Sequence, residues 1–219
     1  MSLKLYAHPF SSYCQKVLIA LYENETRFEL RLLGPGDEGV TAEFESLWPL
    51  KRMPVLVDAG LAFMEATIII EYLHLNHPGL VRLIPADPHA ALEVRFLDRF
   101  FDNYVMTPMQ RIVFDFIRPP ENRDAYGVAQ ARSLLDTAYA WLDGQLHGRE
   151  WSAGNEFSLA DCAAAPALFY ADWVQPIAER WTNVREYRRR MLARPSFARA
   201  VDEARPYRSL FPPGAPDRD

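Results

Sequence analysis

Cysteine is scarce in this chain, with only Cys14 and Cys162 among 219 residues. Two cysteines so far apart cannot form a disulfide framework, so the fold must depend on its own core. A chain of this length can bury enough apolar surface to do so without cross-links. Because few cysteines suit a reducing compartment, we expect a cytoplasmic protein.

A long apolar run is also missing. The most apolar stretch, residues 159–171, contains Asp161 and Pro166 and is too short to cross a hydrocarbon core about 30 Å thick. The first residues pass directly into the alternating pattern of a strand, which predicts no export signal. We therefore expect no membrane span.

An excess of positive charge is the third absence, since 24 basic residues face 29 acidic ones and the net charge is −5. Such a surface repels a phosphate backbone on average, so we do not expect nucleic acid as a partner. Acidic residues surround the one basic cluster, which we interpret as a solvated helix face. Its members are Arg185, Arg188, Arg189, Arg190 and Arg194.

Metal ligands are few as well. Of the five histidines, only His74 and His77 are spaced as helical neighbours, and no third ligand is evident. We expect no metal. Residues 34–39 spell the dinucleotide fingerprint Gly-x-Gly-x-x-Gly, but two carboxylates inside that loop would repel a pyrophosphate. We interpret this loop as a flexible turn.

The pattern of the residues that are present changes once along the chain. Up to about residue 77, short strands alternate with helices in the order βαβαββα. Beyond a proline-rich linker at 79–88, only helical periodicity remains. We therefore predict an α/β domain over residues 1–78 and an all-α domain over 89–219.

The segment 8–17 joins the first predicted strand to the first helix and places Ser11 at the helix N-terminus. Unpaired backbone amides and the helix dipole would stabilise a thiolate there, and the hydroxyl can donate one more hydrogen bond. A plain helix cap is the alternative. Cys14 lies one turn further on, where a thiol is more typical of a buried side chain than of a nucleophile.

Two further segments suit a peptide-like ligand. Pro54 directly precedes an apolar strand, where a cis peptide bond would leave the backbone of Met53 free to pair with an extended ligand. A trans edge proline is the alternative. Glu65 and Ala66 begin a helix whose free amides can hold a carboxylate. Glu65 can equally be an ordinary acidic residue of a first helical turn.

In their order and spacing these features together resemble the cytosolic glutathione S-transferase family, over nearly the whole chain. The features are Ser11 before a helix, Met53-Pro54 before a strand, Glu65-Ala66 at a helix start, the linker Ile84 to Pro88, and Ser158 to Asp161 at the start of a later helix. The resemblance implies a thioredoxin-like glutathione-binding domain followed by a helical bundle that lines the acceptor site. It also implies a serine-type bacterial enzyme, similar to the theta, zeta and beta classes, and a homodimer.

The resemblance assigns roles to individual residues. Ser11 falls where serine-type members hold the glutathione thiolate, and Glu65 where the family holds the γ-glutamyl group. Met53 falls where the family's backbone pairs with the cysteinyl part, and Pro54 on its cis-proline. Lys51 and Arg52 are candidate partners of the glycyl carboxylate.

Position 66 departs from the family pattern, which usually has Ser or Thr where this chain has Ala66. The lost hydroxyl bond is worth about 0.5–1.5 kcal/mol, so glutathione affinity falls by about tenfold at most. The chemistry that the resemblance implies is attack of the thiolate on a small hydrophobic electrophile. We expect the electrophile's pocket to be lined by Phe10, Tyr13, Tyr104, Met106, Met109 and Phe114, although these residues also suit a plain core.

Three alternatives remain open at this point. Tyr6 could replace Ser11 as the donor to sulfur, although a packed strand aromatic is more typical. The stretch 65–73 also looks like that of stringent starvation proteins, which use this scaffold to bind other proteins without catalysis. A glutathione-dependent reductase or isomerase would need the same first site and a different second one.

Overall fold

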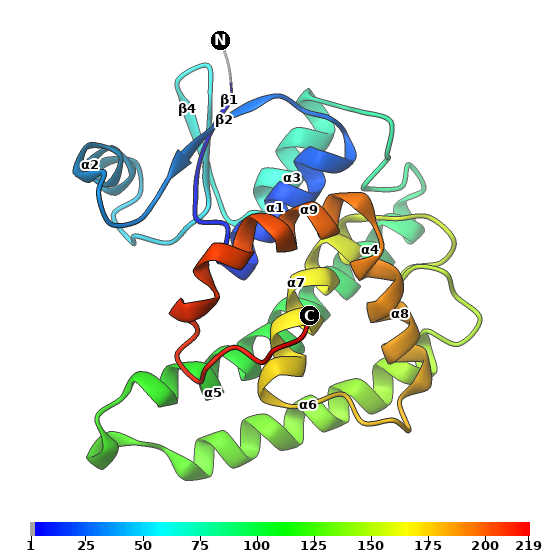
Figure 1. Ribbon diagram of the computed structural model, residues 1–219. Coiled ribbons are helices and arrows are strands. Elements are labelled where there is room, and N and C mark those ends of the chain that lie inside the picture. The colour runs from blue at the N-terminus through cyan, green and yellow to red at the C-terminus, as the bar shows by residue number, and fades with distance from the viewer. Residues whose placement is uncertain (1–2) are drawn as a thin grey trace.

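The computed structural model describes residues 3–219, and Figure 1 shows a β/α part followed by a larger helical part. The first part contains β1 (Leu3–Ala7), α1 (Ser12–Glu23), β2 (Phe28–Leu32), α2 (Glu38–Leu47), β3 (Val55–Asp58), β4 (Leu61–Met64) and α3 (Ala66–Asn76). This is the predicted βαβαββα order. The predicted fold class, a thioredoxin-like α/β unit followed by helices, is confirmed.

The four strands form one sheet in the order β2-β1-β3-β4. β1 and β2 are parallel, whereas β3 is antiparallel to both of its neighbours. Side chains alternate along β1, so Leu3 and Leu5 pack on the face covered by α1, and Tyr6 points to the opposite face. There Tyr6 meets Phe44 of α2. The sheet therefore lies between α2 on one side and α1 with α3 on the other (Figure 1).

The second part is entirely helical, as predicted. Its elements are α4 (Pro88–Phe100), a π-helix (Phe101–Met106), α5 (Thr107–Ile117), α6 (Ala125–Gln145), α7 (Leu159–Val174), α8 (Thr182–Leu192) and α9 (Pro195–Ala204), with 3₁₀ turns at Pro120–Asn122 and Arg205–Leu210. The π-helix connects α4 to α5 without a break. None of the helices in residues 3–219 has the length and apolarity needed to cross a bilayer.

The helix α7 lies inside the helical part and is buried along nearly its whole length. Its start is fixed by the buried carboxylate of Asp161, which accepts hydrogen bonds from Ser158 N at 2.8 Å and Tyr187 Oη at 2.5 Å. Ser158 and Asp161 form a capping box at the helix start that the sequence predicted. One apolar cluster runs from β1 and α1 into α7 and α8, so the two parts share a core.

Several large apolar side chains on the first helix of the second part and on the π-helix are not buried. Leu92, Phe96 and Tyr104 are 65%, 51% and 49% exposed, whereas Val94 and Leu97 face the core. The large apolar side chains lie on the outer surface of α4 and the π-helix.

Candidate functional site

Ser11 lies at the N-terminus of α1, directly after the loop that follows β1. Its backbone is extended (φ −79°, ψ 124°), and its carbonyl accepts the first helical hydrogen bond, from Gln15 N at 2.8 Å. The hydroxyl of Ser11 makes no capping hydrogen bond. The structure therefore gives this side chain no capping role. Its hydroxyl lies within reach of the Cys14 thiol, where a hydrogen bond opposes the rise in the thiol pKa that burial causes.

The loop before Ser11 is held by two buried side chains from different parts of the fold. Gln15 donates to Pro9 O at 2.9 Å, and the Tyr170 hydroxyl of α7 donates to Phe10 O at 2.9 Å. Gln15 and Tyr170 also bond to each other at 3.2 Å. The helical part thus fixes the loop that presents the serine.

A cavity of about 660 Å³ opens beside Ser11 between the β/α part and the α4–α5 segment. All seven residues predicted to bind glutathione line it, and they come from three separate segments of the chain. The predicted residues are Ser11, Lys51, Arg52, Met53, Pro54, Glu65 and Ala66, and the cavity is completed by Tyr13, Arg99, Asp102, Asn103, Gln110 and Phe114.

The segments on the sheet side of this first cavity have distinctive backbones. The Met53–Pro54 peptide is cis, as predicted. Glu65, immediately before α3, has φ +67°, a region that a non-glycine residue occupies only at a cost. Strain of this kind is typical of functional sites, and here it places Glu65 at the helix start beside the free amides of α3. Lys51 pairs with Glu45 at 2.9 Å, near the surface.

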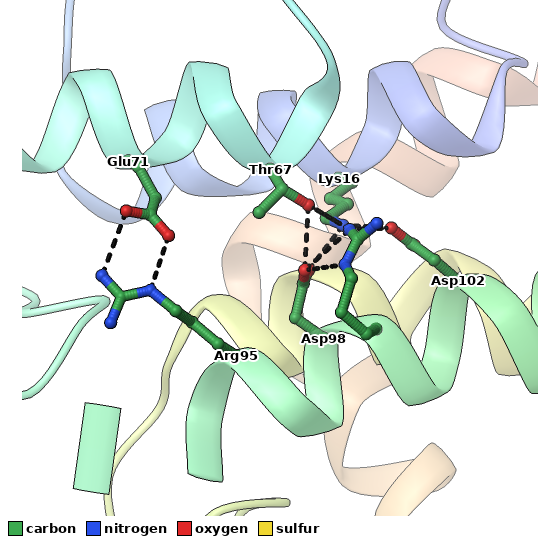
Figure 2. Close-up of polar contacts among 7 residues, drawn as sticks. Lys16, Thr67, Glu71, Arg95, Asp98 and Asp102 are labelled. Carbon is green, nitrogen blue, oxygen red and sulfur yellow. Dashed lines mark hydrogen bonds and ion pairs between the residues drawn. The ribbon is translucent and has the colours of Figure 1, made fainter. Parts of the chain in front are cut away.

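The opposite wall rests on an ion cluster that joins the two parts of the fold (Figure 2). The ammonium of Lys16, which is 1% exposed, lies 2.5 Å from Asp98 Oδ1 and 2.8 Å from Asp102 Oδ2. Thr67 accepts from Lys16 at 2.9 Å and donates to Asp98 at 2.9 Å. Arg99 contacts both carboxylates, at 2.8 and 2.5 Å. We call these five residues the interdomain cluster.

The interdomain cluster is balanced, with two cations and two carboxylates. It links α1 and α3 to α4 and the π-helix, and the neighbouring pair Glu71–Arg95 adds a second link at 2.7 Å (Figure 2). Burial raises the pKa of Asp102, and the adjacent Lys16 ammonium opposes that effect. Arg99 and Asp102 thereby reach the cavity wall in fixed positions.

The sequence did not identify Arg99, Asp102, Asn103 or Gln110 as site residues. A signal was present, because Asp98 and Asp102 are four residues apart, a spacing that puts two carboxylates on one side of a helix. Their partner Lys16 lies in another domain. The pairing therefore follows only from the three-dimensional fold.

Cys14 and Tyr6, the alternatives to Ser11 for contact with the glutathione sulfur, do not line the first cavity. Cys14 is fully buried, and burial raises the pKa of its thiol to about 11. Tyr6 donates to Glu43 at 3.0 Å on the far face of the sheet. Tyr13 does line the cavity, and burial raises the pKa of its phenol to about 12, so it is a protonated donor at neutral pH.

A smaller second cavity, of about 210 Å³, lies next to the first. The two share Ser11, Gln110 and Phe114, so a ligand in one would meet a ligand in the other at the serine. Among residues 3–219, no charged side chain lines this second cavity. Its other members are Phe10, Ser12, Met109, Val113, Ile117, Tyr170, Leu210, Phe211 and Pro212.

Of the six residues predicted for the acceptor pocket, Phe10, Met109 and Phe114 line the second cavity, and Tyr13 lines the first. Tyr104 and Met106 line neither. Tyr104 lies on the surface against Phe100, and Met106 is buried in the core. Both fall in the π-helix, where hydrogen bonds span five residues and the ordinary helical periodicity no longer predicts the face.

The last part of the chain supplies a wall that the sequence did not predict. Leu210, Phe211 and Pro212 close the second cavity, and Phe211 packs against Trp173 at a ring distance of 5.0 Å. These residues follow the last helix and carry no periodic pattern. Only the tertiary packing brings them next to Ser11.

Comparison with known proteins identifies both parts of the chain. The glutathione S-transferase N-terminal domain matches residues 5–80, and the glutathione S-transferase C-terminal domain matches residues 105–195. A probable maleylacetoacetate isomerase from Vibrio cholerae is 29% identical, with 94% of this chain and 98% of that protein aligned.

Two solved structures share the fold. A glutathione S-transferase from Methylobacterium radiotolerans, in complex with glutathione sulfonate, is 31% identical with a TM-score of 0.79, covering 92% of this chain and 95% of that one. A second, from Methylobacillus flagellatus with glutathione bound, is 26% identical with a TM-score of 0.82, covering 91% and 98%.

Proposed function

Because the chain belongs to the glutathione S-transferase family, we propose that it binds glutathione in the first cavity and transfers it to a small neutral electrophile in the second. The observation that carries this proposal is the position of Ser11. It is one of three residues that line both cavities, and its hydroxyl is not engaged in capping the helix.

The first cavity matches the charges of glutathione from end to end. In the proposed pose the γ-glutamyl ammonium lies by the carboxylates of Glu65 and Asp102, and its carboxylate by the α3 amides and Arg99. The backbone of Met53 pairs with the cysteinyl part. At the other end, Lys51 and Arg52 hold the glycyl carboxylate, with Lys51 leaving Glu45 to do so.

Thiolate stabilisation supplies the chemistry at Ser11. The glutathione sulfur lies at the positive end of the α1 dipole and accepts a hydrogen bond from the serine hydroxyl, and both effects favour the anion over the thiol. Tyr13 is a second protonated donor in the same cavity. The thiolate forms the new carbon–sulfur bond, and the leaving group departs with its electron pair or the adduct takes up a proton.

The lining of the second cavity favours a neutral electrophile over an anionic one. Maleylacetoacetate, on which the Vibrio relative is named to act, carries carboxylates that would need cationic partners. The side chains of this cavity are apolar or uncharged. We therefore place the chain among transferases rather than isomerases of such acids.

The proposed unit is a homodimer of chains with a glutathione-binding domain at 1–78, a linker at 79–88 and an acceptor-site domain at 89–219. Its support is exposed apolar surface on both parts. Leu61, Ile68 and Leu75 of the β/α part are 64%, 53% and 75% exposed, and Leu92 and Phe96 are exposed on α4. Burying the first group of one copy against the second group of another would remove this surface from water.

The test is a calorimetric titration of glutathione into the purified protein and into Glu65→Gln. We expect saturable binding that the variant weakens by about tenfold or more, because a charge-assisted hydrogen bond is worth about 1.5–3 kcal/mol. Turnover of 1-chloro-2,4-dinitrobenzene by the wild-type protein then reports transfer. No binding at millimolar glutathione would refute the proposal and favour a protein-binding member of the fold.

A further inference from the structure

The arginine cluster on and after α8 is only partly the solvated face that the sequence indicated, because Arg185 and Arg189 are exposed whereas Arg188 and Arg194 are not. The side chain of Arg188 is only 12% exposed, and Arg194 forms a paired contact with Glu23 of α1, at 2.6 and 2.5 Å. The prediction is wrong at Arg188, because α8 packs against α7 and the tail that follows residue 210 borders the same cavity. Arg194 therefore has a full carboxylate partner, whereas Arg188 does not.

Arg188 lines a cavity of about 710 Å³ between α8, the end of α7 and the tail. None of its lining residues belongs to either cavity at Ser11. Four arginines and two acidic residues line it, a surplus of two positive charges. The charged members are Arg185, Arg188, Arg189, Arg218, Asp172 and Glu186, and the apolar members are Pro176, Ile177 and Leu192.

The one buried carboxylate in this cavity is shared. Asp172 Oδ1 accepts a hydrogen bond from Ile177 N at 2.8 Å. Its Oδ2 contacts Arg218, which also donates to Asp172 O at 2.9 Å, and lies 3.4 Å from Arg188. Two guanidinium groups therefore compete for one carboxylate oxygen. We call Asp172, Arg188 and Arg218 the tail cluster.

The other acidic groups nearby do not remove the surplus. Asp219 pairs with Arg205 at 2.5 Å and with Arg208 at 3.0 Å. Glu179 lies 3.8 Å from the exposed side chain of Arg185. Glu186 lines the cavity but forms no ion pair with Arg188, so Asp172 is the carboxylate that Arg188 contacts within residues 3–219.

Arg188 is also short of hydrogen bonds. Within residues 3–219, its Nε and Nη2 are buried without a hydrogen-bond partner, because the contact to Asp172 lacks the required geometry. The ring of Phe169, 5.8 Å from Arg188 Cζ, can stabilise the cation but offers no acceptor. Unpaired buried donors are costly, and burial correspondingly lowers the pKa of Arg188.

We propose that this cavity binds a phosphate monoester with a small apolar body, through Arg188 and Arg218. A dianion matches the surplus of two positive charges, and arginine forks suit phosphate oxygens. The apolar body of the ester lies against Pro176, Ile177 and Leu192. The site is separate from the transferase site and adds a second ligand class to this protein.

The experiment is a calorimetric titration of phenyl phosphate into the whole protein and four variants. We expect saturable binding that falls by about tenfold or more in Arg188→Gln, since a lost charge-assisted bond of about 1.5–3 kcal/mol gives that factor. Arg218→Gln, in the partly exposed tail, should show the same loss. This variant still tests the proposal if Arg188→Gln folds poorly. Arg180→Gln, at an exposed arginine outside the cavity, is the matched control and should bind as the wild type does.

Inorganic phosphate and benzyl alcohol separate the two halves of the ligand. Weaker binding of phosphate than of phenyl phosphate, with no binding of the alcohol, supports the proposal. It is overturned if phenyl phosphate does not bind, if Arg188→Gln and Arg218→Gln bind it as the wild type does, or if Arg52→Gln is the variant that loses binding. The last outcome would place the anion in the first cavity.

Discussion

Two ion clusters tie distant segments of this molecule together, and they differ in their charge balance. In the interdomain cluster, Lys16 and Arg99 face Asp98 and Asp102, so cations and carboxylates are equal in number. In the tail cluster, Arg188 and Arg218 face Asp172 alone. The first cluster is complete within the chain, whereas the second has positive charge to spare.

This difference suggests different uses. A balanced, buried cluster can hold Arg99 and Asp102 rigidly at a cavity wall, as a site for a zwitterion requires. In a cluster with surplus positive charge, a buried cation loses hydration without gaining a full carboxylate partner. A bound anion would supply that partner. The same side-chain types thus build a scaffold in one place and a candidate ligand site in the other.

The largest expected effect comes from breaking the balanced cluster with Lys16→Met. Two carboxylates then stay buried with Arg99 as their only cation, and loss of one partner from a buried ion pair costs about 3–5 kcal/mol. Urea unfolding measures this cost. Lys4→Met, at an exposed lysine on β1, is the control and should change stability by about 0.5 kcal/mol or less. A loss of under about 1 kcal/mol in Lys16→Met would show that the cluster is not essential to the fold.

A smaller effect is expected from Arg99→Gln, which removes the half-exposed cation that faces the first cavity. We expect the KM for glutathione to rise by about tenfold with little change in kcat, since Arg99 is proposed to bind the γ-glutamyl carboxylate and not the sulfur. Initial rates with varied glutathione give the answer. The control is Arg118→Gln, at an exposed arginine of the helical part, which should leave the KM unchanged. An equal KM in both variants would show that Arg99 does not bind glutathione.

The smallest effect is expected from Arg188→Met in the tail cluster. Asp172 keeps Arg218, the apolar stem still covers Phe169, and an underpaired buried charge is removed. Without phosphate ester present, we expect the free energy of unfolding to change by about 1 kcal/mol or less. A loss comparable to that of Lys16→Met would mean that Arg188 is already satisfied, and the contrast between the clusters would disappear.

The predictable parts of the site were those encoded in short segments. Ser11, Pro54 and Glu65 each lie where a strand and a helix meet, so local rules of helix ends and proline geometry identified them. Strand alternation likewise placed β1 correctly. These features depend on neighbouring residues, and one sequence contains all of that information.

The site residues that the sequence missed or misplaced depend mainly on contacts between distant segments. Phe211 reaches the second cavity only because the tail packs on Trp173, and the burial of Arg188 requires the same tail. Tyr104 was misplaced because a π-helix interrupts the helical repeat. Arg99 was missed because its cluster partner Lys16 is far away in sequence.

The proposed transferase activity depends on stabilisation of a glutathione thiolate at Ser11, and the pKa of the bound thiol tests this most directly. Ultraviolet absorbance of the thiolate, followed against pH with saturating glutathione, gives that pKa in the wild type, in Ser11→Ala and in the control Ser12→Ala. We predict a wild-type pKa below the usual thiol value of about 8.5. The thiolate fraction and the reaction rate should then rise in parallel with pH, over a lower pH range than for free glutathione. In Ser11→Ala the pKa should rise by about one to two units, because a hydrogen bond to a charge is worth about 1.5–3 kcal/mol. A bound thiol that titrates at its free value, or equally in the wild type and Ser11→Ala, would contradict the account.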